Sequence, residues 1–382
     1  MSRSSEVWDD SKWALGLMSG TSRDGVDAAL LHTDGRRRVS PGPFLSLPYE
    51  ASFRQRLAVV CGGNLDSLAE VERDLTRWHA QAARQLLSDH GISTTEVGII
   101  GFHGHTIAHA PEEGRTRQIG DGALLADATG IDVVMDFRSQ DMAAGGEGAP
   151  LAPLYHLARA TELARPLAVL NIGGVANVSW IGAADLTDRG EECLDGSQLL
   201  AFDTGPGNAL LDDWVLAMTG HAYDQDGRLA AGGQVHEDIV EAFLGNPYFA
   251  RPPPKSLDRD AFDLSLLAGL SAADGAATLT ALTAAAVVRA HKQVPAPPRQ
   301  WLVCGGGRRN PVLMDLLGDR LTAPVAPVEA VGWNGDAIEA EAFAYLAVRV
   351  LEGWPLSVPS TTGARAPTTG GRLCRTRRAP DS

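Results

Sequence analysis

Five glycine-rich segments, each following a run of apolar residues typical of a β-strand, are the most informative chemical feature of the sequence. They occupy residues 20–25, 101–104, 171–174, 203–208 and 304–307. Any one of them has an ordinary explanation as a tight turn, because glycine tolerates backbone conformations that other residues avoid. Glycine also lets backbone N–H groups approach phosphate oxygens, and Thr21 and Ser22 add hydroxyl donors. Five such turns together favour a nucleotide held between glycine turns.

The common nucleotide and nucleophile motifs are missing from the sequence. There is no Gly-x-x-x-x-Gly-Lys-[Ser/Thr] segment, and no Gly-x-Gly-x-x-Gly opens a helix after the first strand. These absences argue against a P-loop enzyme and a Rossmann dehydrogenase. Gly-x-Ser-x-Gly is also absent, which leaves an α/β-hydrolase nucleophile without support.

Asp203 is the leading candidate for a reacting group. It ends the apolar run 199–203 and stands directly before Thr-Gly-Pro-Gly-Asn at 204–208. In α/β folds a carboxylate at the C-terminal end of a strand faces the crevice where ligands bind, so Asp203 could act as a general base toward a hydroxyl group or water. The structural alternative is that Asp203 caps a helix, which Pro206 is suited to start.

Other charged residues allow both a chemical and a structural interpretation. Asp24 and Asp27 could hold Mg²⁺ through water or be ordinary turn and strand residues. Arg138 could donate to an anionic or polyhydroxy ligand or form a surface ion pair. Glu339 lies beside the apolar side of a predicted helix and is either solvated or turned into a cleft.

Three histidines lie within or shortly after the second glycine segment. His103, His105 and His109 resemble a metal cluster at first sight, but no carboxylate or cysteine accompanies them at ligand spacing. Contact of His103 with a substrate or phosphate is the favoured interpretation.

Alternating strands and helices must position these residues, which predicts an α/β protein. The apolar runs predict strands at 13–18, 26–31, 97–102, 131–137, 167–172, 175–181, 199–203 and 301–304. Helical patterns cover about 65–90, 119–129, 206–219, 235–244, 263–293 and 335–352. A main domain boundary is expected near 163–166. Two strand-turn-strand units, near residues 20 and 173, suggest related halves.

The composition of the chain argues against nucleic acids and membranes as binding partners. The 382 residues include 33 Lys and Arg against 47 Asp and Glu, a net charge of −14 that argues against a nucleic-acid binder. No apolar run reaches the roughly 18 residues of a membrane helix, and no signal peptide begins the chain. The four cysteines are far apart and lack metal-ligand spacing, which fits reduced thiols. We therefore expect a cytoplasmic protein without nucleic-acid or membrane partners.

The glycine segments and their flanks, in this order, resemble the anhydro-N-acetylmuramic acid kinase family, a branch of the sugar kinase, Hsp70 and actin superfamily. The matching segments are 17–27, 101–107, 118–121, 129–138, 143–153, 170–179, 202–208, 253–256, 303–307 and 339–347. The resemblance covers roughly residues 14 to 372. Long motifs in a fixed order make coincidence a poor explanation.

The resemblance implies an actin-like fold of two domains, each a mixed five-stranded sheet flanked by helices, with the active site in the interdomain cleft. The N-terminal domain would comprise residues 1–163, joined by the C-terminal segment 355–382, and the second domain residues 164–354. The resemblance also implies a homodimer.

The implied activity is ATP- and Mg²⁺-dependent. The family opens the 1,6-anhydro ring of anhydro-N-acetylmuramate with water and phosphorylates O6, which gives N-acetylmuramate 6-phosphate and ADP in cell-wall recycling. Asp203 would be the base that activates water, and Arg138, His103 and Glu339 would contact the sugar. The residues implied in ATP binding are Gly20, Thr21, Ser22, Arg23, Asp24, Gly25, Val26, Asp27, Gly173, Gly174, Gly205, Gly207, Asn208, Gly305, Gly306 and Gly307. Mg²⁺ would be held mainly through the ATP phosphates and water, near Asp24.

Three positions depart from the usual pattern of the family. Arg23 replaces leucine, His105 replaces glutamine, and the segment 255–260 replaces Lys-Ser-Thr-Gly-Arg-Glu. These departures leave two alternatives open: a kinase for a different anhydro or amino sugar, and a nucleotide-binding sensor without catalysis.

Overall fold

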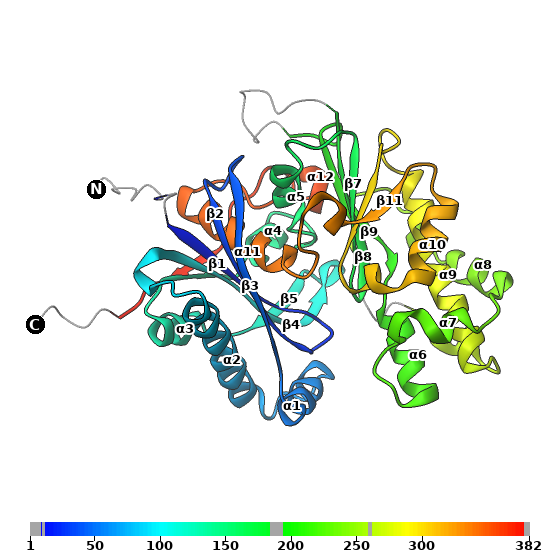
Figure 1. Cartoon of the computed structure of the whole chain (residues 1–382), viewed down its shortest axis with the longest axis horizontal. Coiled ribbons are helices and arrows are strands. Elements are labelled where there is room, and N and C mark those ends of the chain that lie inside the picture. Colours follow the sequence, from blue (N-terminus) through cyan, green and yellow to red (C-terminus); the bar gives the residue numbers. More distant parts are fainter. Residues whose placement is uncertain (1–8, 10–11, 184–193, 259–261, 378–382) are drawn as a thin grey trace, which may run out of the picture. The chain divides into compact units, whose positions relative to one another are not determined.

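Two α/β units make up the chain, and the computed structural model describes residues 9, 12–183, 194–258 and 262–377 (Figure 1). Unit 1 comprises Met1–Thr161, Ala337–Pro359 and Ala364–Ser382, and unit 2 comprises Glu162–Asp336 and Ser360–Gly363. Each unit has its own sheet and its own buried core.

The sheet of unit 1 has seven strands. They are β1 (Trp13–Ser19), β2 (Gly25–Thr33), β3 (Val39–Pro48), β4 (Val97–Ala110), β5 (Arg115–Ile119), β6 (Val133–Met135) and β12 (Arg372–Cys374). Their order is β12-β6-β4-β1-β2-β3, and β5 pairs with β4 outside this path. β1, β4 and β6 run parallel, whereas β2 is antiparallel to both β1 and β3.

Unit 1 has six α-helices among its described residues. They are α1 (Ala51–Cys61), α2 (Leu68–Asp89), α3 (Gly122–Thr129), α4 (Ser139–Ala143), α5 (Pro153–Arg159) and α11 (Ile338–Glu352). Two of them, α2 and α11, pack on opposite faces of the sheet. Leu15 and Leu17 of β1 share a buried cluster with Leu75 of α2. Gly16 points to the other face, where a Cβ would collide with the backbone of α11, so glycine at this position lets helix and strand approach closely.

The sheet of unit 2 has five strands in the order β11-β10-β7-β8-β9. They are β7 (Leu167–Ile172), β8 (Val175–Ile181), β9 (Leu199–Pro206), β10 (Trp301–Cys304) and β11 (Val325–Pro327). β7, β10 and β11 run parallel, and β8 is antiparallel to both β7 and β9.

The helices of unit 2 lie mainly between β9 and β11 in the sequence. They are α6 (Ala209–Thr219), α7 (Arg228–Ala231), α8 (Glu237–Leu244), α9 (Ala272–His291) and α10 (Pro311–Arg320), and the short α12 (Pro359–Thr362) follows α11. Ala284 and Val287 of α9 and Leu313 of α10 pack against the strands in one buried cluster. A second cluster joins α6, α8 and α9 around Trp214 and Phe243.

The two sheets share one plan. The series β3-β2-β1-β4-β6 in unit 1 and β9-β8-β7-β10-β11 in unit 2 have the same order and the same strand directions. This repetition confirms the expectation of two related α/β halves with mixed sheets. Unit 2 has the expected five strands, whereas β5 and β12 extend the sheet of unit 1 to seven.

The division into units differs from the sequence-based prediction in two segments, 337–354 and 360–363, and the first boundary lies at Thr161 and Glu162 and not at 163 and 164. Ser360–Gly363 were expected with the N-terminal domain but group with unit 2. Residues 337–354 were expected with the second domain, but contacts group Ala337–Pro359 with unit 1. The physical reason is the packing of α11 on β1, β2 and β4. Within residues 364–377, β12 pairs with β6.

Among the described residues, no helix is long and apolar enough to cross a membrane. Cys61, Cys304 and Cys374 form no disulfide within the described part of the chain, and Cys193 lies outside it.

Candidate active site

Three of the glycine segments come together in unit 2. The turn Gly173-Gly174 joins β7 to β8, and the segment after β9 lies against it: the Asn208 N–H donates to the Gly173 carbonyl at 2.7 Å, and the Gly207 N–H to the Gly174 carbonyl at 3.0 Å. A Cβ at Gly207 would collide with the Gly173 carbonyl oxygen. Close backbone contact therefore requires glycine at position 207.

The third segment, at the end of β10, adjoins the first two. Gly305 has a φ of +74° and leaves no space for a Cβ beside Asn171 and Ile172. The Asn208 side-chain amide donates to the Ile172 carbonyl at 3.1 Å, and a Cβ at Gly306 would lie 3.5 Å from the same amide. We name the residues 173–174, 205–208 and 305–307 the glycine cluster of unit 2.

Arg308 anchors the third segment, residues 305–307, through the Gly305 carbonyl. Its side chain is only 6% exposed, and it donates to the Gly305 carbonyl at 2.9 Å and pairs with Glu329 at 2.9 Å and Asp336 at 3.0 Å. The Glu329 pKa is lowered, although burial alone would raise it, because backbone N–H groups and the Arg308 guanidinium favour the charged carboxylate.

Asp203 is buried in β9, next to the glycine cluster in sequence. The strand continues to Pro206, so Asp203 lies within it and not at its end, and α6 begins at Ala209 with Asn208 as its N-cap residue. The structural alternative of a helix cap is therefore wrong. The Asp203 carboxylate instead accepts the Leu257 N–H at 2.8 Å through Oδ2.

Lys255 lies beside Asp203 and was not among the predicted site residues. Its carbonyl accepts the Asp203 N–H at 2.9 Å, and its buried ammonium group donates to the Tyr248 carbonyl at 3.1 Å. Tyr248 in turn donates its hydroxyl to the Asp203 carbonyl at 2.5 Å. Burial, reinforced by Arg251, lowers the Lys255 pKa to about 8, while the negative charge of Asp203 opposes this shift. Residues 259 and 260 of the segment that departs from the family pattern lie outside the described residues.

The first glycine turn, residues 20–25, joins β1 to β2 in unit 1. Thr21, Ser22 and Asp24 are exposed, and the Ser22 hydroxyl donates to Asp24 Oδ1 at 2.7 Å. Arg23 adopts a left-handed conformation with a φ of +57°, and its N–H donates to the Gly20 carbonyl at 3.0 Å. The turn thus presents hydroxyl groups and backbone to its surroundings.

His103 and Arg138 form a second group in unit 1. His103 is buried, and its Nδ1 donates to the Gly104 carbonyl at 3.0 Å. Arg138 donates to His103 Nε2 from Nε at 3.2 Å and from Nη2 at 3.0 Å, and its Nη1 donates to the Gly148 carbonyl at 2.6 Å. Burial and the Arg138 charge hold the His103 pKa well below its usual value, so the imidazole is neutral and accepts from the guanidinium.

His105 is part of the support of the first turn. The Tyr49 hydroxyl donates to Ser19 Oγ at 2.8 Å, Ser19 Oγ lies 3.0 Å from His105 Nδ1, and Cys61 Sγ lies 3.5 Å from His105 Nε2. Burial lowers the His105 pKa to about 4. The departure from glutamine therefore lies in a buried network directly before Gly20.

Glu339 is exposed in the first turn of α11. Two positions on, Glu341 is buried and accepts the Tyr155 hydroxyl, and burial raises the Glu341 pKa. The sequence pattern did not distinguish these two carboxylates.

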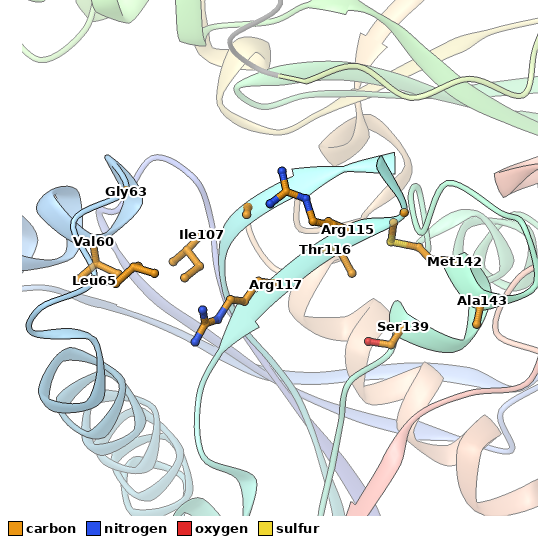
Figure 2. Close-up of a pocket in the computed structure, with 12 residues that line it drawn as sticks. Val60, Gly63, Leu65, Ile107, Arg115, Thr116, Arg117, Ser139, Met142 and Ala143 are labelled. Carbon is orange, nitrogen blue, oxygen red and sulfur yellow. The ribbon is translucent and has the colours of Figure 1, made fainter. Parts of the chain in front are cut away.

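A hollow of about 620 Å³ lies in unit 1 between the end of α1, the β4–β5 hairpin and α4 (Figure 2). Apolar side chains, Val60, Leu65, Ile107 and Met142, and the cations Arg115 and Arg117 line it. Ser139, the neighbour of Arg138 in the chain, is also at its wall. None of the predicted site residues lines it.

The described residues contain no group of three or more His, Cys, Asp and Glu side chains that could hold a metal ion. His103 Nε2 faces the Arg138 guanidinium, which does not suit a metal ligand.

Two α/β units of the same strand order, each with a glycine turn after its first strand, define the class: the chain has the actin-like fold of sugar kinases and related ATPases. Within that class, the chain belongs to the anhydro-N-acetylmuramic acid kinase family, whose model matches residues 12–375. The protein is accordingly a kinase, a phosphotransferase with an alcohol group as acceptor.

Relatives agree over almost the whole chain. The anhydro-N-acetylmuramic acid kinase of Paramagnetospirillum magneticum is 59% identical over 94% of this chain and 98% of its own length. That of Rhodospirillum rubrum is 53% identical over 95% of this chain and 94% of its own length. Among solved structures, a ROK family glucokinase from Streptomyces griseus aligns with 88% of this chain and 99% of its own, at 15% identity and a TM-score of 0.38, a likeness too remote to add to the assignment.

Proposed function

We propose that the chain converts 1,6-anhydro-N-acetylmuramate, ATP and water into N-acetylmuramate 6-phosphate and ADP, a step in the recycling of cell-wall sugars. In this reaction the bond between C1 and O6 of the anhydro bridge breaks, water supplies a hydroxyl group to C1, and O6 receives the γ-phosphoryl group. Membership of the family and 59% identity to a kinase of that name support the proposal.

The observation that carries the proposed mechanism is the fixed carboxylate of Asp203. It is 7% exposed, does not cap α6, and is oriented by the Leu257 N–H at Oδ2. A buried, oriented carboxylate beside glycine turns suits a general base. We propose that Asp203 takes a proton from the water that attacks C1, while O6 leaves and becomes the acceptor for phosphoryl transfer.

The glycine turns suit the phosphates of ATP. A Cβ at Gly173 would meet no atom closer than 3.7 Å, and one at Gly20 none closer than 3.5 Å, so neither backbone is tightly covered at these positions. We propose that the turn 20–25 and the glycine cluster of unit 2 hold the phosphates and adenosine, with their N–H groups aimed at the charge that develops on the transferred phosphoryl group. Mg²⁺ would bind mainly through phosphate oxygens and water, near the exposed carboxylate of Asp24.

Arg138 is the proposed sugar-binding cation. Its guanidinium is held by His103 and by the Gly148 carbonyl, so little side-chain freedom is lost when it binds a polar ligand. Because both nitrogens of His103 already have partners, we propose that His103 acts on the sugar by orienting Arg138. Glu339, exposed in the first turn of α11, is the proposed second polar contact.

Replacing the base tests the mechanism. We expect Asp203→Asn to bind ATP with unchanged affinity and to lose sugar-dependent ADP release by about 1,000-fold, because an amide cannot accept the proton. Asp224→Asn is a matched control, since Asp224 is also buried and also accepts backbone N–H groups, from Leu229 and Ala230. An Asp203→Asn variant with full turnover would remove Asp203 from the mechanism.

A further inference from the structure

The carboxylate of Asp141 is buried in α4, three residues after Arg138, and the proposed mechanism does not use it. The residue is 2% exposed. Its Oδ2 accepts the Gly148 N–H at 2.7 Å, and its Oδ1 accepts the Ser357 hydroxyl. A buried carboxylate is costly unless it is well hydrogen-bonded, so these contacts require an explanation.

The segment 144–148 wraps around this carboxylate. The Gly146 N–H donates to the Asp141 carbonyl at 2.9 Å, and a Cβ at Gly146 would collide with the carboxylate. Gly145 and Gly148 have φ values of +87° and +69°, a conformation that favours glycine. Asp141 thus fixes the backbone of the segment 144–148, which is rich in glycine and has few side chains that could anchor it.

The backbone N–H and carbonyl groups of Gly148 link Asp141 to Arg138. Its N–H donates to Asp141, and its carbonyl accepts Arg138 Nη1 at 2.6 Å. On the opposite side of the guanidinium, His103 Nε2 accepts Nε and Nη2. Gly148 and His103 together fix the plane of the guanidinium, and Asp141 contacts the residue on the Gly148 side.

We propose that Asp141 is a positioning residue for Arg138: its carboxylate holds Gly148 so that the Gly148 carbonyl fixes the guanidinium in the orientation that the sugar requires. The kinetic test of this inference rests on the proposed function, in which Arg138 binds the sugar. Charge-assisted hydrogen bonds to a carboxylate are stronger than those to a neutral acceptor, which suits a group that must hold a glycine-rich segment rigid.

A double-mutant cycle tests the proposal. The variants are Asp141→Asn, Arg138→Met and the pair, with KM for the sugar and for ATP measured separately. We expect Asp141→Asn to raise the sugar KM about 10-fold and to leave the ATP KM unchanged, because a small misplacement of a binding group weakens binding strongly. In the Arg138→Met background the same change should have almost no further effect, since the two residues act in one chain of contacts.

Two further variants separate positioning from general stability. Asp224→Asn, in unit 2, also disturbs a buried carboxylate that holds backbone N–H groups, and we expect it to lower the melting temperature without raising the sugar KM. Ser357→Ala removes one hydrogen bond from Asp141 and leaves the charge in place. It should raise the sugar KM about 2- to 3-fold, and it carries the test if Asp141→Asn does not fold.

A chemical readout does not depend on turnover. Peptide-resolved modification by phenylglyoxal should reach Arg138 several times faster in Asp141→Asn than in the wild type, with Arg349, which is fully buried, as internal reference. Additive effects in the cycle, or an unchanged rate of Arg138 modification, would overturn the proposal. If the wild type showed no sugar-dependent turnover, the proposed function would be overturned. The rate of Arg138 modification would still decide whether Asp141 positions Arg138.

Discussion

The two units repeat one sheet plan but hold their first hairpin turn in different ways. In unit 1 the turn 20–25 has side-chain support besides its backbone hydrogen bonds: the Ser22 hydroxyl donates to Asp24, and Tyr49, Ser19 and His105 form a buried network directly before Gly20. In unit 2 the turn Gly173-Gly174 is fixed by backbone groups of Gly207 and Asn208.

This difference shows at which positions near the two turns a side chain fits. Backbone-to-backbone contact leaves no space for a side chain at Gly207, whereas a Cβ at Gly20 meets nothing closer than 3.5 Å. The contrast holds for these two glycines and not for the whole turns: a Cβ at Gly25 of unit 1 would collide with the Leu47 carbonyl oxygen, whereas one at Gly173 of unit 2 would meet nothing closer than 3.7 Å. Of the three departures from the family pattern, Arg23 and His105 lie in unit 1, and the segment that begins at Lys255 lies in unit 2.

After Asp203→Asn, the largest expected effect concerns Arg138, the cation that unit 1 contributes through a side chain. Arg138→Met removes three hydrogen-bonding directions and the charge, and we expect kcat/KM for the sugar to fall about 100-fold with the KM for ATP unchanged. Steady-state kinetics with each substrate varied in turn measures this. Arg77→Met, which removes an exposed arginine on α2, is the control, and an equal loss in both variants would contradict the assignment.

The contrast between Gly207 and Gly20 predicts a smaller effect for two matched glycine substitutions. Gly207→Ala forces a Cβ against the Gly173 carbonyl, and we expect a loss of about 1–3 kcal/mol of unfolding free energy and a roughly 10-fold higher ATP KM. Gly20→Ala should change the free energy of unfolding by less than about 0.5 kcal/mol, because a Cβ there makes only ordinary van der Waals contact. Denaturant unfolding and ATP titration compare the two. If Gly20→Ala were the more damaging change, the contrast would be wrong.

The smallest effect concerns the acid sensitivity of the support in unit 1. Burial in the folded chain lowers the His105 pKa to about 4 from its usual 6.5, so the unfolded chain binds the proton more readily. The stability that comes from a neutral His105 is therefore complete above pH 6.5 and is lost as the pH falls toward 4. At pH 8 the imidazole is neutral in both the folded and the unfolded chain. Between pH 8 and about pH 6 the free energy of unfolding should fall in the wild type by somewhat less than about 1 kcal/mol more than it falls in His105→Gln. Equal pH dependence in the two proteins would show that His105 is not the titrating group.

The sequence predicted the central strands well and the peripheral ones poorly. β7, β8 and β10 have the bounds that their apolar runs predicted, because strands covered on both faces are apolar throughout. β5 begins Arg-Thr-Arg-Gln and β11 has only three residues, so neither gives an apolar pattern. α10 was missed although its signals, Asn310 as N-cap and Pro311 in the first turn, are present in the sequence.

The candidate site was predictable where its residues are neighbours in the sequence. The segment 203–208 brings Asp203 and part of the glycine cluster together, and the resemblance to a family named Arg138 and His103. Lys255 and Leu257 could not be found in this way, because they meet Asp203 only through contacts across 52 and 54 positions of the chain. Asp141 was missed because its partners, Gly148 and Ser357, give no periodic signal.

The most direct test of the central claim is ADP release from ATP and Mg²⁺ with 1,6-anhydro-N-acetylmuramate, beside N-acetylmuramate, N-acetylglucosamine and a control without sugar, with mass spectrometry of the product. The account predicts release that depends on the anhydrosugar and a product whose mass equals that sugar plus one water and one phosphoryl group. Preference for another sugar would indicate a kinase of different specificity. ATP binding without any sugar-dependent ADP release would contradict the account and favour a nucleotide-binding sensor.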